Sequence, residues 1–212
     1  MCRIGAFPPW PGPALQPSCG EPRVLLCKSS GRLTLVHSNT ELLIDYWRSR
    51  RGGRAAPRRS DIDPVDFARL LPRAFIAEAR ASGDVVFRLA GEAIIELHGR
   101  PLAAVSLPSL WRHDHRRHLL TALEAALRSA RPLVVGAELG RDRGAGARLE
   151  VLFAPLAGPS GDVDRFLGLN QPLNGGFTAP LDLLVIANLA GVPIEVVANP
   201  LRLAAVDGRR LA

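Results

Sequence analysis

Arginine is concentrated in residues 48–59, which hold six arginines and no acidic residue, and three aspartates follow within residues 61–66. Guanidinium groups hold carboxylates and phosphates through paired hydrogen bonds. Three uses are therefore open: a solvated turn, a structural site in which arginines pair with the nearby aspartates, or a site for a phosphate or nucleotide-like anion. We favour structural pairing because the acids lie so close. The residues of the anion or structural site are Arg50, Arg51, Arg54, Arg58, Arg59, Asp61 and Asp63.

A second polar cluster, RHDHRRH, fills residues 112–118. Its three histidines and Asp114 would suit a divalent metal if their side chains converged. The three arginines among them would repel a cation, and Asp114 also suits the first turn of a helix. We therefore interpret the cluster as the polar start of a helix and expect no metal site.

The chain shows no sequence motif of an enzyme: it lacks a G-x-S-x-G elbow, a phosphate-cradling glycine loop and an H-E-x-x-H pair. The net charge of +7 and the pI near 10.7 raise the alternative of nucleic-acid binding. Acids interleave with arginines everywhere outside residues 48–59, which argues against that alternative. We expect no catalytic residues.

The elements that must position these residues follow from periodicity and turn signals. Apolar residues at helical spacing predict helices over 39–50 and 112–130, with a shorter one over 92–98, and Asp63-Pro64 is a helix start. Alternating segments separated by glycine-containing turns predict strands over 74–81, 85–90, 133–139, 147–156 and 163–169. This order predicts an α+β fold: a five-stranded antiparallel sheet with helices on one face, plus an N-terminal helix.

The ends of the chain differ in composition from this core. Residues 1–37 are rich in Pro, Gly and Ser and are interpreted as a flexible arm, which a misassigned start codon could also explain. Residues 177–212 form a C-terminal extension, in which 181–189 could be helix or strand. The three cysteines all precede the core, so we expect a reducing, cytoplasmic setting. Polar residues and a proline interrupt residues 181–198, so no membrane span is expected.

Several short motifs, in order, resemble the PAS-like family common in alphaproteobacteria, over about residues 38–176. The motifs are Trp47, RGGR at 51–54, PRRSDIDP at 57–64, LLP at 70–72, FRLAG at 87–91, Gly99-Arg100, Leu110-Trp111, Arg131-Pro132, Asp164-Arg165 and Leu167-Gly168. The resemblance implies a sensory or interaction fold and no set of catalytic residues.

A PAS-like fold also implies a small apolar pocket between sheet and helices, the default ligand site. Its expected walls are Phe87, Leu89, Ile94, Leu97, Leu123, Leu127, Val135, Leu152 and Leu169. PAS folds can hold haem, for which His98 is the candidate axial ligand, but a single histidine is weak support and the cofactor stays unknown. No cysteine lies in the core, which argues against flavin–cysteine chemistry.

These observations favour a non-enzymatic sensory or regulatory module that binds a small ligand or relays a protein contact. We expect a homodimer and an unidentified signalling protein as partners. The alternative function is a nucleic-acid- or anion-binding protein that uses Arg48 to Arg59.

Overall fold

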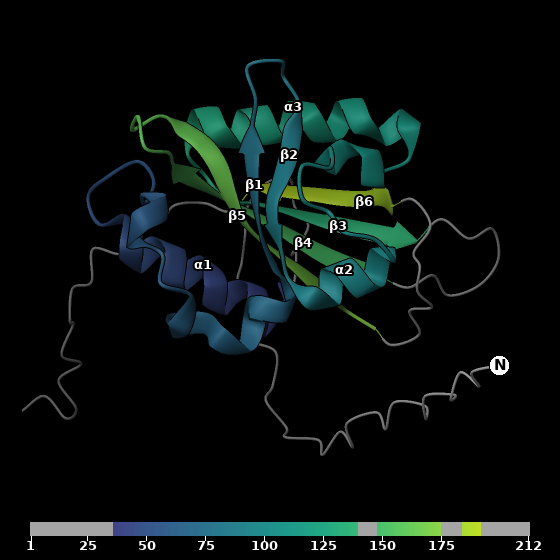
Figure 1. Cartoon of the computed structure of the whole chain (residues 1–212), viewed down its shortest axis with the longest axis horizontal. Helices are drawn as coiled ribbons and strands as arrows, with labels where there is room; N and C mark the ends of the chain where they lie inside the picture. Colours follow the sequence, from purple (N-terminus) through teal and green to yellow (C-terminus); the bar gives the residue numbers. More distant parts are fainter. Residues whose placement is uncertain (1–35, 140–147, 175–183, 192–212) are drawn as a thin grey trace, which may run out of the picture.

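Six antiparallel strands form one sheet in the order β2-β1-β5-β4-β3-β6 (Figure 1). The computed structural model describes residues 36–139, 148–174 and 184–191. The strands are β1 (Ala74–Ala79), β2 (Val85–Ala90), β3 (Leu133–Leu139), β4 (Arg148–Ala157), β5 (Val163–Pro172) and β6 (Leu184–Gly191). The predicted five-stranded antiparallel sheet is confirmed, and the segment left open near the C-terminus is a strand, β6, beside β3.

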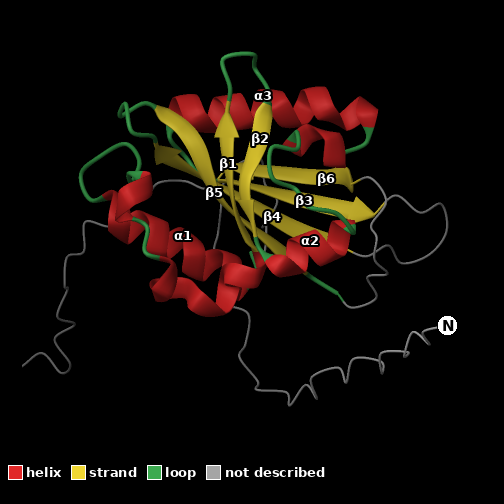
Figure 2. Ribbon diagram, viewed as in Figure 1, coloured by secondary structure: helices red, strands yellow, loops and turns green. Residues whose placement is uncertain are grey.

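Helices cover both faces of this sheet (Figure 2). The first face packs against α2 (Glu92–His98), the 3-10 helix η3 (Leu107–Leu110) and α3 (His113–Ser129). The second face packs against α1 (Ser38–Arg51) and the 3-10 helix η2 (Pro64–Arg73), and the short 3-10 helix η1 (Arg59–Asp61) lies between them in the chain. The expected single helical layer thus describes the first face, and the N-terminal helix belongs to a second layer.

Four phenylalanines form a continuous row in the core of the first face. The rings of Phe75 and Phe87 have centroids 5.4 Å apart, and Phe153 contacts Phe75 and Phe166 with both centroid separations at 5.7 Å. All three pairs are edge-on, the arrangement that aromatic quadrupoles favour. The row ties β2, β1, β4 and β5 together on this face.

A β-bulge changes the alternation of side chains in β2. Ile76 pairs with Leu89 and Ala77 pairs with Phe87, so Arg88 is the extra residue. An extra residue reverses which face the following side chains occupy. Phe87 therefore lies in the first face, whereas Leu89 lines a groove of the second layer.

The second face holds α1 through one large aromatic side chain. Trp47 is fully buried (0% exposed), and its indole Nε1 donates a 2.6 Å hydrogen bond to the carbonyl oxygen of Pro155 in β4. Leu43 and Ile44 are buried beside it. The three follow helical spacing, which gives α1 one apolar face for the sheet. Among the residues described, no helix combines the length and apolar character needed to cross a bilayer.

Candidate functional site

The first half of the arginine segment forms a local ion-pair network. Gly52, with φ of 58°, ends α1 and turns the chain back along it. Arg50 pairs with Asp66 of η2. Arg54 contacts Asp61 at 2.5 Å and donates a 3.0 Å hydrogen bond to the carbonyl oxygen of Arg50. These contacts join the end of α1 to η1 and η2.

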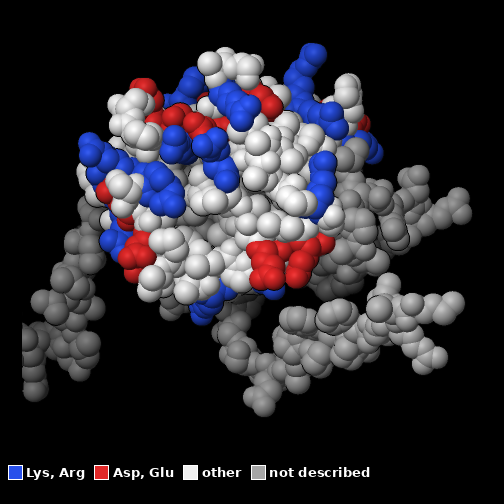
Figure 3. Space-filling model, in the orientation of Figure 1, with Lys and Arg blue, Asp and Glu red and all other residues white. Residues whose placement is uncertain are grey.

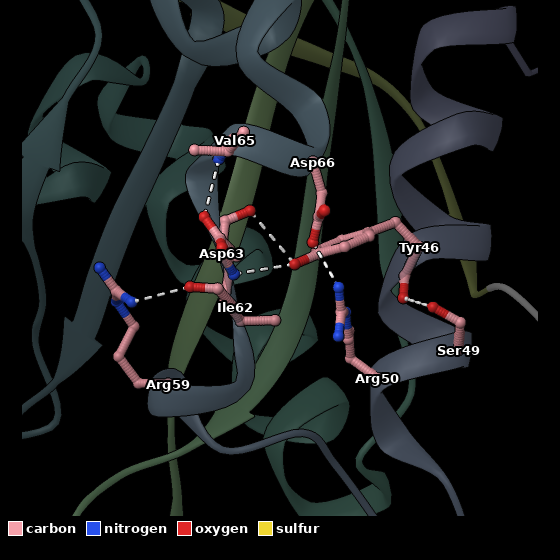
Figure 4. A network of polar contacts seen from close by, with 8 residues as sticks. All are labelled: Tyr46, Ser49, Arg50, Arg59, Ile62, Asp63, Val65 and Asp66. Atoms are coloured by element: carbon pink, nitrogen blue, oxygen red, sulfur yellow. Dashed lines mark hydrogen bonds and ion pairs between the residues drawn. The ribbon is translucent and has the colours of Figure 1, made fainter.

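Asp63 and Tyr46 hold the start of η2 against α1 (Figure 4). The Asp63 carboxylate accepts a 3.0 Å hydrogen bond from the Val65 N–H, so it acts as a helix cap, as its place before Pro64 predicts. The Asp63 N–H donates to the Tyr46 hydroxyl at 2.9 Å. The Arg50 guanidinium lies over the Tyr46 ring, 5.2 Å from its centroid, a favourable cation–π position.

The pKa of Asp61 is lowered, first by the hydrogen bond from the Arg58 N–H and then by the positive charge of Arg54. Both partners stabilise the ionised carboxylate. Asp61 is therefore an anion that neutralises part of the arginine segment. An external anion would have to compete with it for Arg54.

Arg51, Arg58 and Arg59 stand apart from this network. Arg51 is half-buried, and its Nε atom has no hydrogen-bond partner in the described structure. Arg59 makes a long 3.4 Å hydrogen bond to the carbonyl oxygen of Ile62 (Figure 4). Arg58 and Arg59 line a cavity of about 490 Å³ with Arg165 of β5. The predicted site thus divides, and its second half gains an arginine that lies far away in the sequence.

The residues expected to line one apolar pocket lie in three different places. Phe87, Ile94, Leu123 and Val135 are in the core of the first face, and Leu97 and Leu127 pack against it from its margin. Leu152 and Leu169 belong to the second face, and Leu89 is 58% exposed. A single pocket with all nine walls is therefore wrong. Side chains on both faces of β4 and β5 are apolar, so the sequence pattern could not show which residues face which side of the sheet. In β2 the bulge places Leu89 on the opposite face from Phe87.

A groove opens on the second layer, where η2 meets β1 and β2. Its volume is about 190 Å³, and Phe67, Leu71, Ile76 and Leu89 contribute to its apolar walls. Arg59 also lines it. The exposed Leu89 side chain is thus one of several apolar residues that line this groove, and not a single apolar residue on a polar surface.

His98, the candidate haem ligand, ends α2 beside the left-handed Gly99. It is 9% exposed, and its Nε2 atom has no hydrogen-bond partner in the described structure. Burial, with a smaller contribution from the charge of Arg100, lowers the pKa of His98 to about 4. The imidazole is therefore neutral near pH 7 and keeps an unpaired nitrogen inside the protein.

His98 should make the protein sensitive to mild acid. Because its folded pKa lies below the ordinary 6.5, its neutral form stabilises the fold above pH 6.5, and that stability is lost as the pH falls towards 4. The loss is at most roughly 3.5 kcal/mol by the 1.4 kcal/mol per pKa unit relation. We expect His98→Leu to lose correspondingly less stability over this range in urea unfolding. His118→Leu, at an exposed position of α3, is the matched control for the loss of one imidazole.

The histidine cluster at 112–118 is the first turn and a half of α3. The Arg112 guanidinium binds the Asp114 carboxylate through two hydrogen bonds of 2.8 and 2.7 Å, and lies 3.3 Å from His115 Nε2. In the described part of the chain, no three His, Cys, Asp or Glu side chains are grouped to bind a metal ion. The polar-helix interpretation fits this placement.

Sequence reasoning missed a buried polar cluster beneath the start of α1. Glu150 of β4 is 3% exposed and accepts a 3.1 Å hydrogen bond from the His37 N–H. Asn39 donates a 2.9 Å hydrogen bond to Gln171 of β5. Burial raises the pKa of Glu150, and the His37 hydrogen bond partly offsets this effect. The sequence feature that could have indicated this cluster is the single acidic residue, Glu150, within the apolar run of residues 149–157.

The comparison with known families covers the same region as this fold. The model of the PAS domain family matches residues 35–171, a range that contains α1 and ends one residue before the end of β5. No curated protein matches the chain. Two glycines within the match have steric roles: a Cβ at Gly91 would lie 2.2 Å from the Leu71 carbonyl oxygen, and one at Gly168 would lie 2.0 Å from the Phe75 ring. Because the match covers more than half of the 212 residues, the chain belongs to the PAS domain family.

Proposed function

We propose that this PAS domain is a non-enzymatic regulatory module that responds to a small ligand or to a protein contact. The observation that carries the proposal is the family match over residues 35–171, because PAS domains are sensory and signalling modules. The described acids support it: Asp63 caps a helix, and Asp61, Asp66 and Asp114 are paired with arginines instead of with a nucleophile. The cysteine positions favour a cytoplasmic setting.

The second layer supports α1 as the element that carries the response. Trp47 anchors α1 to β4, and the Arg50–Asp66 pair anchors it to η2. A change in the sheet would therefore reach the chain that precedes the domain through one helix. This coupling requires that α1 can occupy two positions, a property that the Trp47 variants considered in the Discussion test.

For the protein contact we propose a second copy of this chain. Leu89 is 58% exposed, Val65 is 78% exposed and Leu71 is 37% exposed, all at or beside the groove between η2 and β2. A twofold dimer uses the same patch on both subunits, and an apolar patch is complementary to itself. Nucleic-acid binding is less favoured, since Arg50 and Arg54 are paired with aspartates.

Native mass spectrometry of freshly purified protein, with an absorption spectrum of the same sample, tests both forms of the proposal. We expect a dimer, and we expect Leu89→Arg to convert it to a monomer. Leu173→Arg is the control, because Leu173 is 44% exposed outside the groove. A stoichiometric extra mass would identify a ligand sensor, and the spectrum would separate haem or flavin from a colourless metabolite. A monomer without added mass would contradict both the dimer and the retained ligand.

A further inference from the structure

The cavity between η1 and the β4–β5 turn has three arginines in its lining, and the Asp164 carboxylate lies against Gly158 at its edge. Its lining residues are Arg58, Arg59, Ser60, Ala157, Gly158, Pro159, Ser160, Gly161 and Arg165. They include three guanidinium groups and no carboxylate. Figure 3 shows basic side chains gathered on the left of the visible face, over the end of α1 and the β4–β5 turn, with acidic ones among them.

Main-chain contacts hold Arg58 and Arg59 at this cavity. The Ala157 N–H donates a 2.8 Å hydrogen bond to the Pro57 carbonyl oxygen, and Arg58 forms a parallel bridge with Ala157. The Arg58 N–H donates to the Asp61 carboxylate at 3.0 Å, and the Asp61 N–H donates back to the Arg58 carbonyl oxygen at 3.0 Å. These bonds fix the backbone while leaving the guanidinium groups of both arginines outside the ion-pair network.

The opposite wall is equally well defined. In the β4–β5 turn the Gly158 N–H donates to the Asp162 carbonyl oxygen at 2.8 Å, and the Gly161 N–H donates to the Gly158 carbonyl oxygen at 3.1 Å. The Ser160 hydroxyl bonds to the Asp162 carboxylate at 2.9 Å. Two ordered walls with fixed spacing make a preformed site, which lowers the entropic cost of binding.

The positive charge of Arg165 is only partly neutralised by the neighbouring carboxylates. Its guanidinium lies 3.5 Å from a Glu78 oxygen and 3.6 Å from an Asp164 oxygen, longer than the 2.7–2.9 Å of a good charge-assisted hydrogen bond. Glu78 also contacts Arg88, at 3.1 Å. The buried Nε atom of Arg165 faces the Asp164 oxygen at 3.6 Å, and neither atom has a hydrogen-bond partner in the described structure.

We propose that this cavity is a binding site for a small phosphorylated molecule, held by Arg58, Arg59 and Arg165. Three guanidinium groups suit the several oxygens and double charge of a phosphate better than a single carboxylate. The volume of about 490 Å³ lies within the range of small-molecule sites and exceeds what inorganic phosphate fills. The site is separate from the core of the first face and shares only Arg59 with the groove at Leu89, so phosphate binding through Arg58 and Arg165 does not depend on the proposed ligand or dimer contact.

The test measures thermal shifts and isothermal titration with inorganic phosphate and pyrophosphate, and with acetate at equal ionic strength as the reference anion. Arg58→Gln and Arg59→Gln each remove one guanidinium while their fixing bonds are made by main-chain atoms. We expect each to weaken phosphate and pyrophosphate binding by about tenfold or more, the value of one charge-assisted hydrogen bond. Arg117→Gln, an exposed arginine of α3, removes the same charge elsewhere and should bind as the wild type does.

Four results decide the proposal. Binding that is lost in the two cavity variants and kept in Arg117→Gln supports it. Equal binding by all variants would show that phosphate is attracted only by the overall positive charge, and it would overturn the proposal. A wild-type protein that responds to neither phosphate nor pyrophosphate would also overturn it. A single-stranded oligonucleotide that binds where both phosphates fail would also overturn it, in favour of a nucleic-acid surface. Circular dichroism confirms folding in each case, and the native mass of the protein reports on the regulatory function separately.

Discussion

Gly168→Ala is expected to destabilise the protein by about 3 kcal/mol or more, at the upper end of the cost of overfilling a core. Gly168 in β5 pairs directly with Phe75 in β1. A Cβ there would lie 2.0 Å from Phe75 Cζ and 2.3 Å from both ring Cε atoms. The Phe75 ring also contacts Phe87 and Phe153, and these two rings restrict its movement away from the clash.

Urea unfolding at pH 7 measures this effect against two comparisons. Gly53→Ala is the matched control, since nothing lies within 4 Å of a Cβ at Gly53, and we expect a change within about 0.5 kcal/mol. In a Phe75→Leu background the smaller side chain should absorb part of the clash, so Gly168→Ala should cost less there. An equal cost of Gly168→Ala in both backgrounds would show that Phe75 is not the obstacle.

Trp47→Ala is expected to cost about 3–5 kcal/mol, the usual price of truncating a buried tryptophan. The indole is fully buried between α1 and the second face, and it supplies the hydrogen bond to Pro155 at 2.6 Å. Removing it leaves both a cavity and an unpaired carbonyl. Trp47→Phe keeps most of the packing and loses the hydrogen bond, so we expect a smaller cost of about 1–2 kcal/mol.

Hydrogen exchange separates local detachment of α1 from global loss of stability. In Trp47→Ala we expect amides of α1 to exchange faster than those of β4 and β5, because α1 joins the sheet through side chains and not through strand pairing. Ser49→Ala, at an exposed position of the same helix, should leave the exchange of α1 nearly unchanged. Uniformly faster exchange throughout the protein would mean that α1 is not a separable element, and the proposed role of α1 would fail.

Features that depend on neighbours in the chain could be predicted from the sequence. The Asp63-Pro64 signal marks the start of η2 because the capping carboxylate and the N–H that donates to it lie two residues apart. The helices and the five expected strands follow from periodicity and from the turns between them. The pairing of Arg54 with Asp61 spans seven residues and is equally local. Short segments of the sequence therefore determine which residues form strands and which form helices.

Features that depend on register were decided by the tertiary structure. The pocket residues in β4 and β5 could not be assigned to a face because both faces of these strands are buried, and the bulge at Arg88 reversed the phase at Leu89. The cavity that joins Arg58 and Arg59 to Arg165 exists because residues 57–58 pair with the end of β4. Likewise Trp47 finds its acceptor 108 residues away. Contacts between distant segments follow from how strands align across the whole sheet, and one residue of slip moves every side chain to the opposite face.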